Sequence, residues 1–445
     1  MRILANIYRD GLKIRISKNY FVKYPFEQMW ANLSKQTRLS IRDNLMYMKI
    51  APYSALMKEQ FSLNTRKPAL KEFVDKSTMK DFPRFAFEDK LPVAMLKNNF
   101  RRAKFKFAKG KPFIPNDDIH PGEGGVLGFS FGKESLLSYA VMKELGLPVK
   151  PTIIEDTWDA EMDHKKALIN AFEKEFDEKV NVVVDEFDNA CLDPVLCHVK
   201  TRGLYGCNAM NGYMMMLLPA AYYFGVNSIV FGNEHNFNEH FVVEEQRTCY
   251  PSYEQSTKWM MQQNKMLGIM TQGKMGLVSY VEPLYNFGEM KVLLQRYPQY
   301  AKYIMSCSHD PYEDRENRWC QGCSACITAF LYITALGHSP KKMGFTIDLF
   351  RKESKKLYLL FHERQRSAYD KSKDVRDSQL LAFYLAYRNK SKGYLIDEFK
   401  KKFLKEAIER QDELIKKYLG LHRSETIPQK YKLQVRRIYK EELED

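Results

Sequence analysis

Between residues 125 and 232, short apolar runs alternate with longer stretches whose apolar residues recur every three or four positions. Short apolar runs bounded by turn residues are typical of buried strands, and the longer period is typical of helices. The pattern predicts strands over 125–130, 149–154, 180–186 and 227–232, and helices over about 134–146, 161–175 and 207–225. Strands that alternate with helices favour an α/β fold with a doubly wound parallel sheet.

The N-terminal region mixes strand-like runs, at 1–8 and 11–17, with helical stretches. Its last part, 99–113, alternates lysines with the rings of Phe105 and Phe107, which is the period of a strand with one solvated face. We interpret this segment as an edge strand that its lysines protect from pairing with other chains. The alternative is a basic, aromatic surface for a nucleic acid.

The segment 114–125 is rich in Pro, Gly and Asp and predicts a domain boundary. From about residue 345 the chain is highly charged, with apolar residues at three- and four-residue spacing, so we expect packed amphipathic helices. The chain is therefore divided into a basic N-terminal α+β domain (1–118), a central α/β domain (119–300), a four-cysteine segment (301–340) and a helical C-terminal region (341–445).

The net charge of +15 lies almost entirely in residues 1–120, which carry 25 Lys and Arg against 11 Asp and Glu. This asymmetry indicates an acidic partner, either a nucleic acid or an anionic substrate, although it also serves solubility. Basic residues interrupt every apolar run near the N-terminus that would serve as a signal core. The longest apolar stretch, 213–225, is shorter than the roughly 20 residues of a membrane span. We expect no membrane partner and, by default, a cytoplasmic location.

Four of the eight cysteines crowd into twenty residues near the C-terminal third. Cys307, Cys320, Cys323 and Cys326 have the spacing C-x12-C-x2-C-x2-C. Such a set places four thiolates around one Zn²⁺ ion with no open position, as in structural zinc sites. A [4Fe–4S] cluster takes the same ligands and remains an alternative. His309 lies nearby, and we interpret it as a surface residue.

The strand predicted to end at Ser130 runs through Gly132, Lys133 and Ser135 into a helix. Backbone amides, two hydroxyls and the positive end of a helix then surround one point, where the oxygens of a phosphate fit. The spacing is not that of a Walker A loop, since Glu134 follows Gly-Lys, and the spaced glycines of a dinucleotide fingerprint are missing. An ordinary strand-to-helix turn is the alternative.

The segment 130-SFGKES-135 resembles the Ser-Gly-Gly-x-Asp-Ser signature of the N-type ATP pyrophosphatases, the PP-loop family. Together with the late cysteines it is similar to one branch, the 7-cyano-7-deazaguanine synthases and the ATP-dependent epimerase of the terminal L-glutamate in a UDP-muramoyl dipeptide. The segments that follow the family's order are 231-FGNEHNFNEHF-241, 250-YPSYEQSTKWMMQQNKMLG-268, 281-VEPLYNFGEMKVLL-294 and 319-WCQGCSAC-326. The resemblance covers about residues 124–335.

This resemblance implies an adenine nucleotide alpha hydrolase-like (HUP-type) fold for 119–300, with ATP and Mg²⁺ as ligands and a structural Zn²⁺ ion. The residues assigned to ATP are Ser130, Phe131, Gly132, Lys133, Glu134, Ser135, Ile154 and Glu155, with Asp156 beside them. Asn233 and Glu234 follow a strand at its carboxyl end, where open α/β sheets place substrates, and join Lys133 as catalytic candidates. For Asn233 and Glu234, a structural capping turn is the alternative interpretation.

Several other polar residues are weaker candidates. They are His235 and His240 as acid or base, Lys200 and Arg202 for charge stabilisation, and His164 by similarity to the synthase branch. Surface positions are the alternative for the histidines.

Two loop residues depart from the family's signature. Glu134 replaces Asp and adds a methylene, so a metal or water that it positions shifts by about a bond length. Phe131 replaces Gly, and a bulky aromatic residue is disfavoured at positive φ. We expect either that Phe131 stays at negative φ, with Gly132 making the turn, or that the loop has lost ATP.

The resemblance predicts an enzyme that adenylates a carboxylate on a small metabolite and releases pyrophosphate, followed by amidation, nitrile formation or epimerisation. A tRNA-modifying PP-loop enzyme is an alternative, with Cys191, Cys197 and Cys207 as candidates for a thiolating cysteine. A degenerate nucleotide-binding module is another. For the oligomeric state, a homodimer is one alternative.

Overall fold

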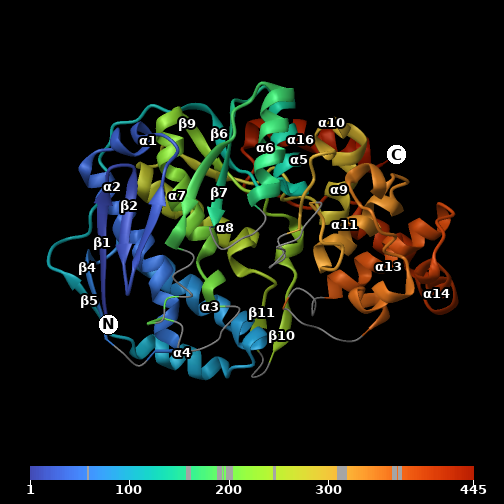
Figure 1. Cartoon of the computed structure of the whole chain (residues 1–445), viewed down its shortest axis with the longest axis horizontal. Helices are drawn as coiled ribbons and strands as arrows, with labels where there is room; N and C mark the ends of the chain where they lie inside the picture. The colour runs from blue at the N-terminus through green and yellow to red at the C-terminus, as the bar shows by residue number, and fades with distance from the viewer. Residues whose placement is uncertain are drawn as a thin grey trace.

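The chain is described by a computed structural model (Figure 1). It describes residues 1–57, 60–156, 162–187, 193, 195–196, 204–243, 247–307, 318–362, 368 and 373–444. The described strands form a ten-stranded sheet and a separate two-stranded ribbon. Helices pack on the sheet and continue beyond it to the C-terminus, so the predicted α/β class is confirmed.

The central half of the sheet is parallel, as the alternation of strands and helices predicted. Its order is β12 (Gly276–Val278), β9 (Val226–Val230), β6 (Gly122–Gly128), β7 (Val149–Asp156) and β8 (Asn181–Asp185), and every neighbouring pair is parallel. The strand order reverses direction between β6 and β9. In open α/β sheets a crevice for ligands lies at the carboxyl ends of the strands beside such a reversal.

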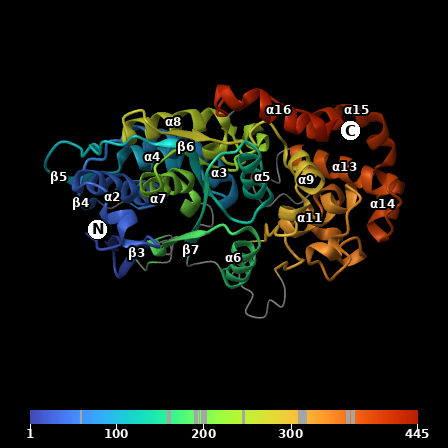
Figure 2. The same ribbon diagram turned by 90° about the horizontal axis from the view of Figure 1, so that it is seen from above.

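Helices cover both faces of this parallel half. Alternation along β6 shows the two faces, since Val126 packs in one core and Leu127 in the other. The face of Leu127 is covered by α5 (Lys133–Glu144), α6 (Met162–Phe176) and α9 (Asn286–Arg296). The opposite face is covered by α7 (Ala209–Phe224) and α8 (Thr257–Thr271), and Figure 2 shows α6 and α7 on opposite sides of the sheet.

The N-terminal strands extend the same sheet across the predicted boundary. They are β1 (Arg2–Tyr8), β2 (Gly11–Arg15), β3 (Asn19–Lys23), β4 (Phe61–Arg66) and β5 (Phe105–Ala108), in the order β3-β2-β1-β4-β5. β3 pairs with β8 in the antiparallel sense, through Val22 opposite Asp185. β5 lies at the far edge of the sheet, so the predicted edge strand is confirmed at Phe105–Ala108, whereas residues 99–102 of the predicted segment belong to α4.

The remaining N-terminal elements are helices on the α7 side of the sheet. They are α1 (Glu27–Ala31), α2 (Lys35–Ile50), α3 (Lys71–Asp89) and α4 (Val93–Arg102). The ribbon of β10 (Phe241–Val243) and β11 (Arg247–Cys249) contacts α3.

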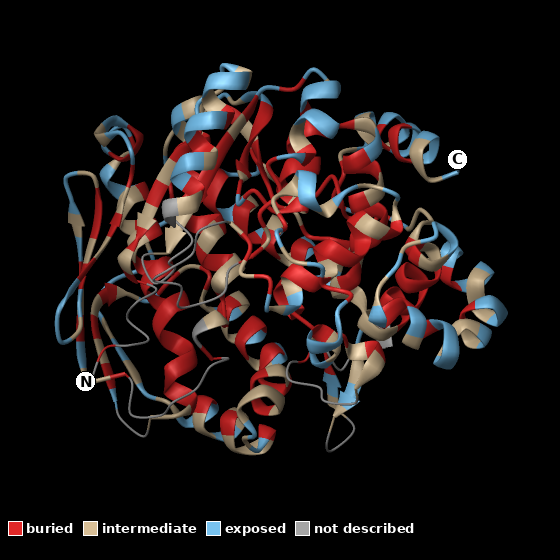
Figure 3. Ribbon diagram, turned by 45° about the vertical axis from the view of Figure 1, so that its right-hand side comes forward, coloured by how far each residue is buried: buried red, intermediate tan, exposed pale blue. Residues whose placement is uncertain are grey.

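The C-terminal half is helical, as its amphipathic pattern predicted. It contains α10 (Pro298–Ala301), α11 (Ser324–Ala335), α13 (Lys373–Arg388), α14 (Tyr394–Lys402), α15 (Leu404–Tyr418) and α16 (Gln429–Leu443). Helices α11 and α16 pack on α9, so the core on the α5 face continues without interruption into this half. Figure 3 shows these buried residues running from the sheet into the helices. No described helix is long and apolar enough to cross a membrane.

Candidate functional site

The predicted phosphate loop connects β6 to α5 and is closed by its own hydroxyls. The amide of Ser130 donates to the Ser135 hydroxyl at 3.2 Å, and the amide of Gly132 donates to the Ser130 hydroxyl at 3.3 Å. The first amides of α5 have no carbonyl partner within the helix, as at every helix start. The loop therefore directs backbone donors and the positive end of a twelve-residue helix into one concave point.

The backbone of Phe131 is left-handed, with φ +60°, so the first of the two expectations, a negative φ, is wrong, and the second, a loop that has lost ATP, stays a prediction. Gly132 has φ −65° and does not make the turn. The Phe131 ring is fully buried, with centroids 4.7 Å from Phe129 and 5.8 Å from Phe172. Burial of such a ring contributes roughly 1.5–3 kcal/mol. This offsets the roughly 1–2 kcal/mol that the left-handed conformation costs a residue with a Cβ.

Lys133, the first residue of α5, is buried among three carboxylates. Its Nζ forms an ion pair with Glu134, and it lies 3.3 Å from a carboxylate oxygen of Glu234 and 3.3 Å from one of Glu289. One oxygen from each carboxylate lies within 4.8 Å of the others. Both oxygens of the fully buried Glu289 accept no hydrogen bond from the described residues. The segment 281–294 that contains Glu289 was noted for its order along the chain, but Glu289 itself was not singled out, because the sequence did not show that α9 packs on α5.

Burial and mutual repulsion control the protonation of this cluster. Burial, opposed by Lys133 and aided by Glu134, raises the pKa of Glu234 to about 8. Burial and the charge of Glu234 raise the pKa of Glu289 well above its ordinary value. Burial acts to raise the pKa of Glu134, but Lys133 outweighs it and lowers that pKa. Burial and mutual repulsion therefore favour the protonated forms of Glu234 and Glu289, and the ammonium of Lys133 favours the ionised form of Glu134.

A cavity of about 460 Å³ lies at the carboxyl ends of β6, β7 and β9. Ser130 and Ser135 of the loop line one end, and Ile154 and Asp156 of β7 line another part. Glu155, which was also assigned to ATP, is not among the lining residues. Lys165 is buried and lines this cavity, whereas the candidate His164, which precedes it in the sequence, does not.

A larger cavity of about 590 Å³ lies between α5, α9 and α11. Lys133 lines one end, Asn286 and Tyr332 line the middle, and Lys356 and His362 line another part of the wall. The two cavities share three lining residues, which are Glu134, Glu234 and Phe237. A ligand in one cavity and a ligand in the other therefore meet at the carboxylate cluster.

Asn233, the second catalytic candidate, is buried at the end of β9 and lines the smaller cavity. Its carbonyl oxygen accepts the Ser279 hydroxyl at 2.9 Å, and its side-chain oxygen lies 3.4 Å from the Gln255 amide. Its side-chain nitrogen has no hydrogen-bond partner among the described residues. The side-chain nitrogen of Asn233 is therefore able to donate a hydrogen bond to a ligand.

Neither loop histidine lines the two cavities. The ring of His235 stacks on His422 at 4.4 Å, and burial, with repulsion from His422, lowers its pKa to about 4. His240 is exposed at the end of the same loop. The geometry therefore does not support either as an acid or base of this site.

The four predicted metal ligands converge at the start of α11. The sulfur atoms of Cys307 and Cys323 are 3.8 Å apart, those of Cys320 and Cys326 are 3.7 Å apart, and all four lie within 4.8 Å. Four thiolates around one tetrahedral ion at about 2.3 Å lie about 3.8 Å from one another. This cluster is therefore able to hold one metal ion such as zinc.

Backbone amides of the same segment point at these sulfurs. The amides of Gln321, Gly322 and Cys326 donate to the sulfurs of Cys326, Cys320 and Cys323, at 3.3 to 3.4 Å. Such outer donors orient thiolate ligands and stabilise their charge. The loop is thus preorganised for a metal ion.

Some candidates lie outside the described residues, namely Cys191, Cys197, Lys200, Arg202 and His309. Cys207 is described and is buried, and burial raises the pKa of its thiol well above the ordinary value. A reactive thiolate is therefore unfavourable at Cys207.

No protein-family model matches the chain, and no curated protein is similar to it at a significant level.

Proposed function

We propose that the chain is an N-type ATP pyrophosphatase that adenylates a carboxylate. One observation carries the proposal: a phosphate loop at the strand-order reversal opens into a cavity that shares Glu134, Glu234 and Phe237 with a second cavity, which Lys133 lines beside them. Two adjoining cavities are what the joining of two substrates requires, because the reacting atoms must be held next to each other. The order β8-β7-β6-β9-β12 supports a HUP-type fold.

ATP is proposed to lie in the smaller cavity. The amides of the loop, the hydroxyls of Ser130 and Ser135 and the ammonium of Lys133 hold the pyrophosphate part, where negative charge accumulates as it leaves. Ile154 offers an apolar contact for the adenine at the end of β7. The α-phosphate then lies toward the shared wall, near Asn233, whose free amide donor suits a phosphoryl oxygen.

The acceptor is proposed to enter the larger cavity with its carboxylate toward Glu234. A carboxylate oxygen attacks the α-phosphorus, a new P–O bond forms, and the bond to the bridging oxygen breaks. The electron pair leaves with pyrophosphate, and an acyl adenylate remains. Attack by ammonia on the acyl carbon then expels AMP and gives an amide, and activation of that amide by a second ATP lets its oxygen leave and gives a nitrile. Alternatively, the neighbouring proton is removed and returned on the opposite face, and hydrolysis of the adenylate releases the epimer and AMP.

Mg²⁺ fits the carboxylate cluster by chemistry. Hard divalent cations prefer carboxylate oxygens, and those of Glu289 accept no hydrogen bond from the described residues, although one lies 3.3 Å from the ammonium of Lys133. Glu134, Glu234 and Glu289 would hold the ion, which supplies positive charge to the phosphates. The ammonium of Lys133 competes with it for the same oxygens, and the raised pKa values of Glu234 and Glu289 oppose binding, because these carboxyl groups must be ionised to hold the ion.

Zinc is proposed as the resident ion of the cysteine cluster. Thiolates that share one ion lie as close together as these do, whereas each thiolate of a [4Fe–4S] cluster binds a different iron. The role is structural, because four cysteines leave no open position.

The proposal is tested by calorimetry with an ATP analogue that resists cleavage at the α-phosphate, with Mg²⁺ present, and by pyrophosphate release across a panel of carboxylates. Ser135→Ala is expected to weaken binding of the analogue at least about tenfold, since it removes one loop hydroxyl that also orders Ser130. Ser138→Ala, one turn further along α5, is the matched control, because its hydroxyl is buried without a partner. Absence of heat with all three proteins favours the degenerate module.

The tRNA-modifying alternative uses the same ATP site with an RNA acceptor. Thiolation through Cys207 is disfavoured by its burial. If modified tRNA rather than a small metabolite consumes the adenylate, pyrophosphate release will depend on added tRNA.

A further inference from the structure

Five strands of the sheet carry helices on one face only. Ile3, Ala5, Leu12, Ile14 and Leu63 of these strands point toward α2 and α7, in one continuous core. The core beneath α5, α6 and α9 contains no residue of β1 to β5. Among the described helices, none packs a hydrophobic core against the second face of these strands.

The pairing register maps the side chains of this uncovered face. Strand alternation assigns it the residues between those of the core. Three rows cross the strands: Asn6, Lys13 and Phe21; Leu4, Arg15 and Asn19; Arg2, Ser62 and Lys106. Each row contains a cation, and no acidic side chain stands in these rows. The face is therefore a basic surface built on regular strands.

Two aromatic rings lie on the same face. Tyr8 is 49% exposed, and its ring meets the partly exposed ring of Phe21 at 5.6 Å in an edge-on contact. Gly11, opposite Tyr8 in the register, has no side chain to separate them. The ammonium groups of Lys23 and Lys13 lie 4.7 Å and 5.7 Å from the Phe21 ring centre. The rings are thus accessible and flanked by cations.

Further cations continue from this face to the edge strand. Residues 90–116 contain eight Lys and Arg and no acidic residue. Four of them lie in or beside β5, are exposed and form no ion pair with the described residues: Lys104, Lys106, Lys109 and Lys111. Arg101 and Arg102 end α4, on the α7 side of the sheet. Glu186, which pairs with Lys23 at 3.2 Å, is the acidic residue at the opposite rim. The basic surface therefore extends from β3 to the end of β5.

We propose that this sheet face binds single-stranded nucleic acid, with bases stacked on Tyr8 and Phe21 and phosphates held by Lys13, Arg15 and Lys106. Exposed rings on a sheet, flanked by cations, stack unpaired bases, and every base offers such a face. A duplex keeps its bases stacked on each other, so it leaves the rings unused. An acidic protein or an anionic membrane complements the cations but has no need of the ring pair. The proposal is independent of the ATP site.

The test is fluorescence anisotropy of the full chain with a labelled oligonucleotide of about 12 nucleotides, as RNA, as DNA and as a duplex. The single strands are expected to bind more tightly than the duplex, and the tighter of the two identifies the sugar. Tyr8→Ala is expected to weaken single-strand binding about fivefold or more. The triple variant Lys13→Gln, Arg15→Gln, Lys106→Gln is expected to reduce the slope of log Kd against log salt by about 2.

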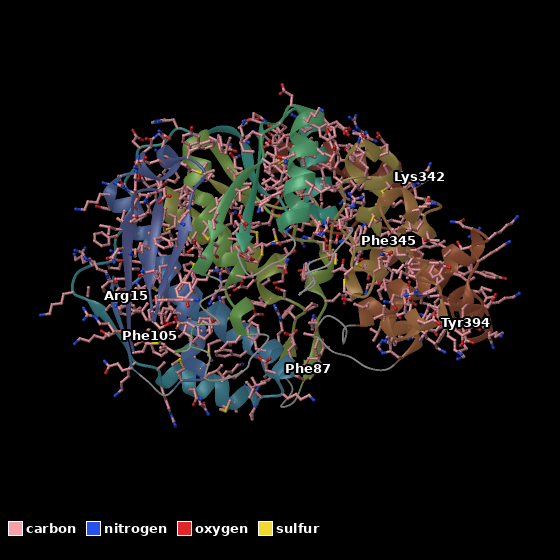
Figure 4. The ribbon with its side chains drawn as sticks, in the orientation of Figure 1. Arg15, Phe87, Phe105, Lys342, Phe345 and Tyr394 are labelled. Atoms are coloured by element: carbon pink, nitrogen blue, oxygen red, sulfur yellow. The ribbon has the colours of Figure 1, made fainter. Side chains whose placement is uncertain are left out.

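Matched controls lie at the other end of the molecule. Tyr394→Ala removes a ring of similar exposure, 39%, and Figure 4 shows Tyr394 far from Arg15. The triple variant Lys400→Gln, Lys401→Gln, Lys405→Gln removes the same charge from α14 and α15. Equal losses in the controls overturn the proposal, as does no binding of single strands at low salt. Equal affinity for polyglutamate or anionic vesicles, with the same loss in Tyr8→Ala, also overturns it.

Discussion

The amide of Met305 donates a hydrogen bond of 2.8 Å to the carbonyl oxygen of Phe131. Met305 lies two residues before Cys307, so this bond connects the phosphate loop directly to the chain segment that enters the cysteine cluster. Tyr303 of the same segment packs its ring against Phe131, with centroids 6.4 Å apart. The left-handed conformation of Phe131 is thus held from the metal-binding side as well as by its own burial.

Loss of the metal ion is expected to weaken nucleotide binding, because the segment that holds Phe131 loses its anchor. Cys320→Ser removes one thiolate and is expected to lower the metal content from about one ion per chain to near zero. The Kd of the ATP analogue is expected to rise about tenfold. Atomic absorption and calorimetry measure the two quantities. Cys249→Ser, at a buried cysteine outside the cluster, is the control and is expected to keep the metal content and the Kd of wild type. Unchanged nucleotide affinity in metal-free protein would contradict the connection.

The backbone conformation of Phe131 predicts an unusual order of stability. Both Phe131→Ala and Phe131→Gly lose the buried ring and are expected to unfold about 3 kcal/mol more easily than wild type. The Gly variant is expected to be about 1 kcal/mol more stable than the Ala variant, because only glycine adopts positive φ without cost. Urea unfolding measures both.

Phe129 supplies the comparison, since it is equally buried and its φ is not positive. There the Gly variant is expected to be the less stable of the two, by about 0.5–1 kcal/mol. The same order at both positions would show that the left-handed conformation of Phe131 does not persist in solution.

The buried carboxyl of Glu234 predicts a dependence of stability on pH. The folded protein keeps its proton up to about pH 8, whereas an ordinary carboxyl loses it near 4.5. Unfolding therefore releases a proton between these values, and wild-type stability falls as pH rises through this window. Glu234→Gln has no proton to release. The unfolding free energy of this variant minus that of wild type is expected to increase by at least about 1 kcal/mol from about pH 5 to about pH 8.

Urea unfolding at several pH values measures this gain. The exposed Glu353→Gln variant, at a side chain 72% accessible, is expected to parallel wild type. Parallel profiles for Glu234→Gln and wild type would place the proton elsewhere in the cluster.

Glu282 fixes the segment between α15 and α16 to the edge of the sheet. This buried carboxylate accepts the amides of Glu425 and Thr426, at 3.0 Å and 2.8 Å, and the Thr426 hydroxyl at 2.6 Å. Thr426→Val is expected to lower the unfolding free energy by about 1–3 kcal/mol. Hydrogen exchange is expected to rise at residues 421–428. Thr248→Val, at an exposed threonine, is expected to change the unfolding free energy by less than about 0.5 kcal/mol.

Features that depend on neighbouring residues could be predicted from the sequence. The loop from Ser130 to Ser135 combines a strand end, hydroxyls and a helix start within eight residues, and the structure places it as expected. The cysteine spacing brought Cys307, Cys320, Cys323 and Cys326 together for the same reason, since a short chain limits where the sulfurs can lie. Period-two patterning identified β5 as an edge strand.

Features that depend on contacts between residues far apart in the sequence could not be predicted in this way. The φ of Phe131 follows from packing against Phe172 and Tyr303, which are 41 and 172 residues away along the chain. Glu289 enters the site because α9 packs on α5, and a lone glutamate in a helix carries no signal of that. The pairing of β3 with β8 crosses a segment that reads as a boundary, so periodicity alone did not reveal it.

The pairing of β3 with β8 also affects how the chain folds during its synthesis. β8 leaves the ribosome on the order of 160 residues after β3, which at about 5–20 residues per second is a delay of roughly ten to thirty seconds. During that delay the first three strands expose an open edge at Val22 and Lys23. A nascent chain of this protein therefore depends on chaperones, or on the charge of its basic first third, to avoid aggregation before β8 arrives.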